Sequence, residues 1–173
     1  GGEGPAERTG GQVEGIIAAV QEVRAELVIG MGGGSVMDAA KLVAAGPRAG
    51  TSARRLLDDC SLVEKGAETV MIPTTAGSGS EATPNAIVTV PEQELKVGIV
   101  NTKLIADNVV LDPAATATLP RHIAASAGVD ALAHTIECYP SNTANAFSDI
   151  WAMNGMRLSF RSIAAACNSG HDE

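Results

Sequence analysis

The chain has 173 residues, 45% of them hydrophobic and 18% charged, which is the composition of a globular protein. Its formal net charge of −8 argues against binding to nucleic acid or to an anionic membrane surface. No hydrophobic run approaches the ~20 residues of a membrane-spanning helix, and no secretory signal pattern is present. Because Cys60, Cys138 and Cys167 are odd in number and far apart, we expect no disulfide framework and a cytoplasmic location.

The first two thirds of the chain alternate between strand and helix patterns. Hydrophobic periodicity predicts helices over residues 12–26, 35–45 and, more briefly, 54–57. Runs of β-branched residues predict strands, and the two that flank Pro91-Glu92-Gln93-Glu94 predict a hairpin. The predicted strands cover residues 27–31, 69–72, 86–90, 95–100 and 109–111.

The pattern changes after Pro113, where two long helices are predicted over residues 120–138 and 145–166. The second helix has large side chains available for packing, namely Phe147, Ile150, Trp151, Met153 and Leu158. We therefore expect an α/β domain over residues 1–115, with a β-hairpin near 85–100, and the start of an α-helical domain over residues 116–173.

Two glycine-rich segments each follow a predicted strand. In the first, Gly30 to Ser35 separate a strand from a helix, and bare N–H groups at a helix start can bind phosphate. Ser35 is a candidate N-cap there, with Asp38 completing a capping box. The second segment, Thr74 to Thr83, has hydroxyl groups and glycines that suit ribose and phosphate. Each segment alone is also compatible with an ordinary turn.

Asp130 and His134 are spaced i and i+4, which places both side chains on one face of a helix. A carboxylate and an imidazole together suit a divalent first-row metal, although Asp130 is also compatible with a surface charge. His122 lies about 12 Å along the helix from Asp130, too far to share one ion. Cys138 is a possible zinc ligand beside His134, but a buried structural cysteine is the default interpretation. His171 lies in the terminal tail and is not expected to be a ligand.

These motifs, taken together and in this order, resemble those of the iron-dependent (group III) alcohol dehydrogenase family, which has the dehydroquinate synthase-like fold. The similarity runs from about Glu14 to about Ile163. It is carried by Gly32-Gly33-Gly34-Ser35 with Asp38 and Lys41, by Pro73-Thr74-Thr75-Ala76-Gly77-Ser78-Gly79-Ser80-Glu81, by Val110-Leu111-Asp112-Pro113, and by Gly128-Val129-Asp130-Ala131-Leu132-Ala133-His134.

The resemblance implies a Rossmann-like parallel-sheet domain that binds NAD or NADP, followed by an all-α domain that binds Fe(II), with zinc left open. It implies reversible hydride transfer between the cofactor and a small primary or secondary alcohol or aldehyde, with metal ligands Asp130 and His134 also catalytic. Gly33, Gly34 and Ser35 would hold the pyrophosphate, and Asp38 would lie near the nicotinamide. The remaining cofactor contacts implied are Thr74, Thr75, Ser78, Asn85 and Lys96, of which Lys96 is equally compatible with a solvated hairpin lysine.

The resemblance also makes the chain look like an internal fragment, because the family takes two further metal-binding histidines from a later helical region. A homo-oligomer is expected when the protein is complete. Four alternatives stay open: a glycerol dehydrogenase-like zinc enzyme, a hydroxyacid–oxoacid transhydrogenase, a lyase on the same fold, and a nucleotide-binding fragment without catalysis.

Overall fold

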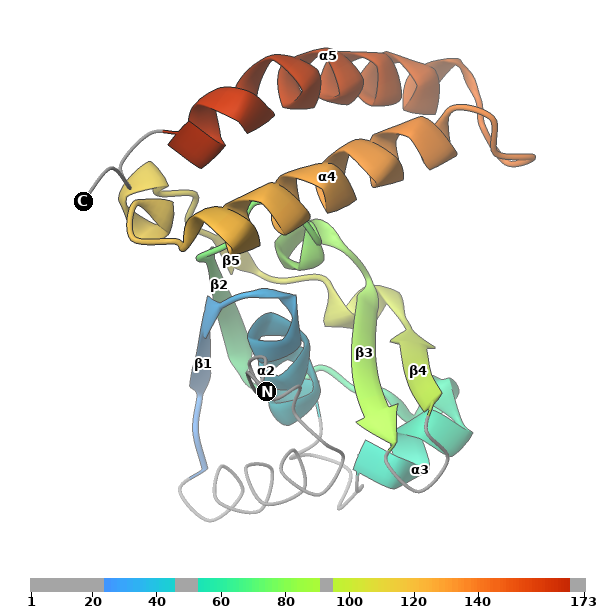
Figure 1. Ribbon diagram of the computed structural model, residues 1–173. Helices are drawn as coiled ribbons and strands as arrows, with labels where there is room; N and C mark the ends of the chain where they lie inside the picture. Colours follow the sequence, from blue (N-terminus) through green and yellow to red (C-terminus); the bar gives the residue numbers. More distant parts are fainter. Residues whose placement is uncertain (1–23, 46–52, 91–94, 169–173) are drawn as a thin grey trace. The chain divides into compact units, whose positions relative to one another are not determined.

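The computed structural model describes residues 24–45, 53–90 and 95–168 (Figure 1). The chain divides into two compact units, each described by itself below. The first unit comprises Gly1–Pro73 and Ser80–Asp112, and the second comprises Thr74–Gly79 and Pro113–Glu173. The second unit thus combines the chain from Pro113 onward with Thr74–Gly79, which is part of the second glycine-rich segment. Among the described helices, none combines the length and hydrophobicity of a membrane span.

Among its described residues, the first unit contains a three-stranded parallel sheet in the order β1-β2-β5 (Figure 1). Residues Leu27 to Gly32 of β1 lie in register with Glu68 to Pro73 of β2. The strand bounds are β1 Leu27–Gly32, β2 Glu68–Pro73 and β5 Asn108–Val109. The strand expected at 109–111 is therefore shorter and begins one residue earlier, although the Val110 N–H still donates to the Met71 carbonyl at 2.9 Å.

A separate antiparallel hairpin is formed by β3 and β4, as the sequence predicts. The described helices of this unit are short, and the longest of those described, α2, packs against β1, β2 and β3. The bounds of these elements are β3 Asn85–Val90, β4 Leu95–Val100, α2 Gly34–Ala45, α3 Ala53–Asp58, and the 3-10 turns η2 Cys60–Leu62, η3 Ser80–Ala82 and η5 Thr102–Leu104.

The hydrophobic core of the first unit is built around α2, which is buried from Met37 to Ala45. A helix that is apolar on nearly all sides has to be enclosed by other elements, and here the sheet and the hairpin enclose it. The main cluster includes Leu42, Val43, Leu56, Val63, Val88, Ile99 and Leu104. On the sheet, Gly30 lies so close to α2 that an added Cβ would come within 2.8 Å of the Ala40 Cβ.

The helix expected over residues 12–26 falls mostly outside the described residues. Its last residues are not helical, because Arg24 has a φ of +50° in a turn and Glu26 lies in a bend just before β1. The expectation is therefore wrong at its C-terminal end, where the chain has to turn into the strand.

The second unit contains a pair of long helices, α4 Arg121–Cys138 and α5 Ala146–Asn168, preceded by the 3-10 turn η6 Pro113–Thr116. Small residues make the close contacts between the helices. A Cβ added to Gly155 would lie 2.6 Å from Thr135 Cγ2, and one added to Gly128 would lie 3.1 Å from Ile163 Cγ1.

The sequence predicts that the large side chains of α5 pack against other parts of the protein, but they are exposed. The face of α5 that contacts α4 is the one that contains Gly155. Of the described residues of α5, only Ala152 is buried. The exposed side chains are those of Phe147, Ile150, Trp151, Met153 and Leu158.

Candidate coenzyme and metal site

The turn between β1 and α2 presents a helix N-terminus directly after a strand. The Gly33 carbonyl accepts the first two helical hydrogen bonds, from Val36 N at 3.0 Å and Met37 N at 3.1 Å. Gly33 is therefore the N-cap, and the expected capping box of Ser35 and Asp38 is wrong. The N–H groups of Gly34 and Ser35 precede the first intrahelical donor, which is the arrangement that binds phosphate oxygens.

The Asp38 side chain points away from this terminus into the protein. Its carboxylate accepts hydrogen bonds from the Ser80 hydroxyl and, at 3.0 Å, from the Ile87 N–H. The Lys41 ammonium lies 3.4 Å from Asp38 Oδ1 and also donates to the Asn85 carbonyl at 2.7 Å. Burial lowers the pKa of Lys41, and the Asp38 carboxylate opposes this shift. Sequence reasoning assigns no role to Lys41.

The hydroxyl-bearing segment Thr74–Gly79 belongs to the second unit, where it packs against α4. A Cβ added to Gly77 would lie only 2.8 Å from the Ala127 carbonyl oxygen, so this contact requires glycine. Ala127 lies three residues before Asp130, on the same helix. Of the predicted coenzyme contacts in this segment, Thr74 and Thr75 are half-buried, and Ser78 is exposed.

The two coenzyme contacts predicted on the hairpin lie on different strands. Asn85 opens β3 and pairs with Val100, while Lys96 follows the first residue of β4 and pairs with Thr89. The Asn85 carbonyl is held by Lys41, and the Lys96 side chain is exposed.

Asp130 and His134 lie on α4 with Asp130 Oδ1 and His134 Nε2 3.9 Å apart. Their side chains are 52% and 55% exposed, respectively. Bonds of about 2.0–2.2 Å to one metal can span an O···N separation of up to about 4.3 Å, so both donor atoms are close enough to reach the same ion. Across the described part of the chain, no third His, Cys, Asp or Glu joins them.

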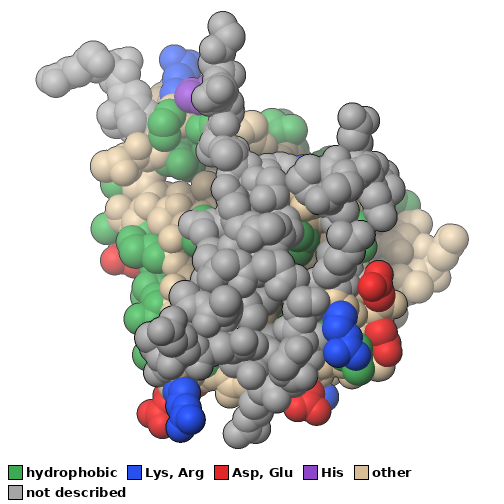
Figure 2. All heavy atoms as spheres, turned by 90° about the horizontal axis from the view of Figure 1, so that it is seen from below, with side chains coloured by type: hydrophobic (Ala, Val, Ile, Leu, Met, Phe, Trp, Pro, Cys, Tyr) green, Lys and Arg blue, Asp and Glu red, His purple; other side chains and the backbone are tan. Residues whose placement is uncertain are grey.

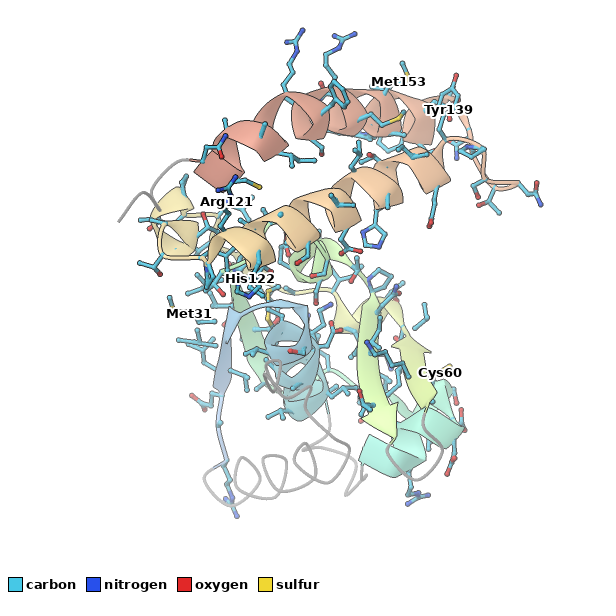
Figure 3. All side chains as sticks on the ribbon, viewed as in Figure 1. Met31, Cys60, Arg121, His122, Tyr139 and Met153 are labelled. Carbon is cyan, nitrogen blue, oxygen red and sulfur yellow. The ribbon has the colours of Figure 1, made fainter. Side chains whose placement is uncertain are left out.

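The remaining candidate ligands do not converge on this pair. His122 lies at the start of α4, at the opposite end of the helix from Tyr139 (Figure 3). Cys138 is exposed rather than buried, which corrects the structural default expected for it, because α4 buries none of its residues here. His171 lies outside the described residues.

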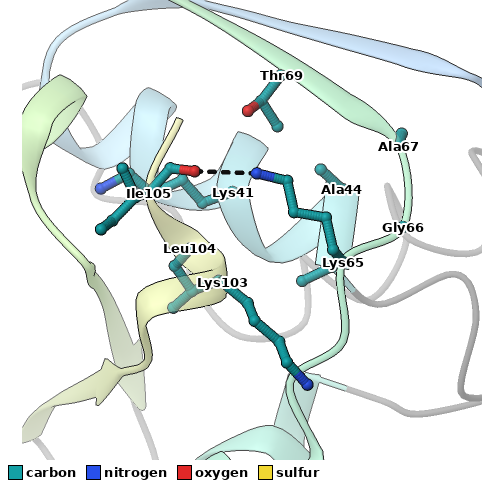
Figure 4. Close-up of a pocket in the computed structure, with 10 residues that line it drawn as sticks. Lys41, Ala44, Lys65, Gly66, Ala67, Thr69, Lys103, Leu104 and Ile105 are labelled. Atoms are coloured by element: carbon teal, nitrogen blue, oxygen red, sulfur yellow. Dashed lines mark hydrogen bonds between the residues drawn. The ribbon is translucent and has the colours of Figure 1, made fainter. Parts of the chain in front are cut away.

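A pocket in the first unit is lined by three lysines, Lys41, Lys65 and Lys103, but is not a good anion site (Figure 4). Each ammonium is already bound within the protein. Lys65 donates to the Ile105 carbonyl at 3.2 Å and pairs with Asp107 at 2.7 Å, and Lys103 donates to the Val63 carbonyl at 2.9 Å. Among the described residues visible in Figure 2, acidic side chains lie beside basic ones at the edge of the view.

Comparison with known proteins agrees with the motifs. The family model described as "Iron-containing alcohol dehydrogenase" matches residues 3–113, and that described as "Fe-containing alcohol dehydrogenase family, C-terminal" matches residues 124–173. The chain belongs to the iron-containing alcohol dehydrogenase family. Its α/β fold, with a parallel sheet followed by helices, is the fold class that the sequence predicts.

Curated members of the iron-containing alcohol dehydrogenase family are similar over most of this chain. A long-chain-alcohol dehydrogenase from Geobacillus thermodenitrificans is 36% identical over 91% of this chain and 40% of that protein. A 1-propanol dehydrogenase from Citrobacter freundii is 34% identical over 89% of this chain and 38% of that protein. The chain therefore spans less than half the length of these curated relatives.

Solved structures of iron-containing alcohol dehydrogenases and related enzymes superpose closely. The iron-containing alcohol dehydrogenase from Thermotoga maritima is 33% identical, with a TM-score of 0.87 over 95% of this chain and 45% of that one. Sulfoacetaldehyde reductase from Bifidobacterium kashiwanohense, solved in complex with NAD+, is 27% identical with a TM-score of 0.90, over 97% of this chain and 45% of that one.

Proposed function

We propose that the protein is a metal-dependent alcohol dehydrogenase that transfers hydride reversibly between a nicotinamide coenzyme, NAD or NADP, and a small primary or secondary alcohol or aldehyde. The observation that carries this proposal is the Asp130–His134 pair on one exposed face of α4, in a chain of the iron-containing alcohol dehydrogenase family.

The coenzyme half of the proposal rests on the α2 N-terminus. Gly33, Gly34 and Ser35 would bind the pyrophosphate there, because backbone N–H groups and the helix dipole both favour negative charge. Thr74, Thr75 and Ser78 would contact the nucleotide through hydroxyl groups, and Asn85 and Lys96 would line the coenzyme from the hairpin. Asp38 is proposed to lie near the nicotinamide end of the coenzyme, where its carboxylate would hold the protein groups that it binds, the Ser80 hydroxyl and the Ile87 N–H.

The metal half rests on the donor atoms of α4. A bound divalent metal, Fe(II) or alternatively zinc, supplies a Lewis acid that polarises the substrate oxygen. Asp130 would contribute a negatively charged ligand and His134 a neutral imidazole nitrogen, each held on a single rigid helix. The side chains are exposed on the described surface, so substrate and metal can both reach them.

The names of relatives support the substrate class. The 1-propanol and long-chain-alcohol dehydrogenases are both named for alcohols, and sulfoacetaldehyde reductase is named for an aldehyde. We further propose that the protein acts in the cytoplasm as a homo-oligomer; the acidic net charge of −8 and the unpaired cysteines suit a cytoplasmic enzyme.

The test compares three variants in the full chain by metal content, coenzyme binding and turnover of 1-propanol. Asp130→Ala and His134→Ala are each expected to lose metal and turnover together while retaining coenzyme affinity. Gly33→Val is expected to keep the metal and to bind coenzyme about tenfold more weakly, because bulk displaces the phosphate from the helix terminus.

His122→Ala is the matched control, since it removes an imidazole from the same helix about 12 Å from Asp130. It should leave metal content unchanged. Full turnover of the wild-type protein after exhaustive chelation would refute the metal-dependent mechanism. Unchanged coenzyme affinity in Gly33→Val would refute the phosphate assignment.

A further inference from the structure

Two opposite charges lie buried on consecutive turns of α2, the helix whose N-terminus is the proposed phosphate site. The Lys41 side chain is 0% exposed and that of Asp38 is 9% exposed. Burying two charges is costly unless each is paired and its remaining hydrogen-bonding capacity is satisfied. The partners of Asp38 and Lys41 therefore show what the pair holds in place.

Apart from each other, the partners that the structure shows for both side chains fall in one segment, Ser80 to Ile87. The Lys41 ammonium donates to the Thr83 carbonyl at 3.1 Å, the Thr83 hydroxyl at 3.2 Å and the Asn85 carbonyl at 2.7 Å. The two Asp38 oxygens accept from the Ser80 hydroxyl and the Ile87 N–H, one each. Lys41 thus binds the middle of the segment, and Asp38 binds both of its ends.

This segment leads directly into the hairpin that carries the proposed coenzyme contacts Asn85 and Lys96. The N-terminus of α2, about one turn before Asp38, carries the proposed pyrophosphate site at Gly34 and Ser35. Asp38 and Lys41 therefore connect the two parts of the first unit that have to be correctly spaced to hold a whole dinucleotide. Because both Asp38 oxygens are bound by protein groups, the geometry favours an indirect role over contact with the nicotinamide.

We propose that Asp38 and Lys41 are positioning residues that hold the Ser80–Ile87 segment in register with α2 for dinucleotide binding. This inference rests on the proposed function. Stability alone does not explain why this position holds a charged pair, because apolar side chains can often replace a buried ion pair without loss of stability. Three carbonyl and hydroxyl acceptors in one segment give a defined position that an apolar contact does not.

The experiment measures the affinity of the full chain for NADH or NADPH, whichever it binds, and separately for ADP. ADP carries the phosphates that α2 would bind but lacks the nicotinamide half, so its binding does not depend on contacts to that half. Lys41→Met should weaken binding of the reduced dinucleotide about tenfold and change ADP affinity less than about twofold. Ser80→Ala is the second variant, with a smaller change in the same direction, in case Lys41→Met fails to fold.

Lys65→Met is the matched control. Lys65 also donates to a backbone carbonyl and pairs with an aspartate, but its partners Ile105 and Asp107 lie outside the Ser80–Ile87 segment. This variant should leave both affinities unchanged, even if it lowers the melting temperature.

A folded Lys41→Met or Ser80→Ala variant that binds the dinucleotide as tightly as the wild type would overturn the proposal. Parallel weakening of dinucleotide and ADP would also overturn it, because the defect would then lie in α2 itself. Wild-type protein that binds neither ligand would instead refute the proposed function, on which the inference depends.

Discussion

The two units of the chain bury their hydrophobic residues very differently. In the first unit, α2 is enclosed by strands from two sheets, and Met37, Leu42, Leu56 and Met71 are each 0% exposed. In the second unit, α4 buries none of its residues and α5 buries only Ala152. The same chain thus combines a unit with a well-formed core and a helix pair whose contact leaves the large apolar side chains of α5 exposed.

This difference shows that element prediction and packing prediction are separate problems. Among the described residues, both units contain helices that periodicity predicts, namely α2 and α3 in the first unit and α4 and α5 in the second. The first unit packs large aliphatic side chains, whereas the helix pair brings Gly128 and Gly155 to its contact and leaves Phe147 and Phe160 72% and 79% exposed. Exposed apolar surface of this kind commonly marks a place where further protein binds.

The largest expected effect comes from shortening a core side chain of the first unit. Leu42→Ala should lower the free energy of unfolding by about 2–5 kcal/mol, since the cavity it leaves is surrounded by packed atoms. Phe160→Ala, the counterpart on α5, should change it by no more than about 0.5 kcal/mol. Chemical denaturation of both variants in the full chain measures the contrast. An equal loss of unfolding free energy in the two variants would mean that the Phe160 side chain is buried in the full protein. The contrast between the two units would then be wrong.

An intermediate effect is expected where the helix pair is in close contact. Gly155→Val should destabilise the protein by about 1–3 kcal/mol, because even a Cβ at this position lies 2.6 Å from Thr135 Cγ2. Asn154→Val, on the exposed neighbouring position of the same helix, controls for the change in helix propensity. Thermal unfolding checks both variants. Equal melting temperatures would show that α4 and α5 are not packed as described.

The smallest expected effect on stability comes from Asp107, which binds Lys65 and Thr69 in the first unit. Partial burial raises the pKa of Asp107, but hydrogen bonds from Lys65 and Thr69 outweigh this and lower the pKa below its ordinary value of 3.8. The native state therefore favours the ionised form. The stabilisation should be complete well above pH 3.8 and should be lost as the pH falls through the lowered native pKa.

Asp107→Asn should accordingly be less stable than the wild type near neutral pH by about 1 kcal/mol, with a difference that shrinks under acid conditions. Urea denaturation across a pH series measures it. A difference that stays constant down to the lowest pH would show that the Asp107 charge has no part in stability.

Much of the candidate site follows from the sequence, because its motifs are local. The strand, glycine turn and helix around Gly33 are set by neighbouring residues, and the i, i+4 spacing alone puts Asp130 and His134 on one helix face. The Ser35 cap was wrong because Gly33 fills the N-cap position itself, accepting both first-turn hydrogen bonds. Cys138 was expected to be buried, and it is exposed because α4 has no buried side.

The sequence indicates that Asp38 and Lys41 are buried together, but it does not indicate which groups they bind. Residues Gly34 to Ala45 contain only these two charged side chains in an otherwise apolar helix, so enclosure of the helix has to bury them together. Their acceptors, however, lie more than 40 residues further along the chain, at Ser80, Thr83, Asn85 and Ile87.

The sequence by itself determined the order of the described strands and helices, the glycine turn that precedes α2, and the placement of Asp130 and His134 on one helix face, because each depends on residues within one or two turns of one another. Only the tertiary structure decided that Lys41 is buried, that Asp38 binds protein groups, and that Gly77 packs on Ala127. The physical reason is that burial and hydrogen bonding of a polar side chain depend on which distant backbone groups reach it, and local periodicity carries no information about those partners.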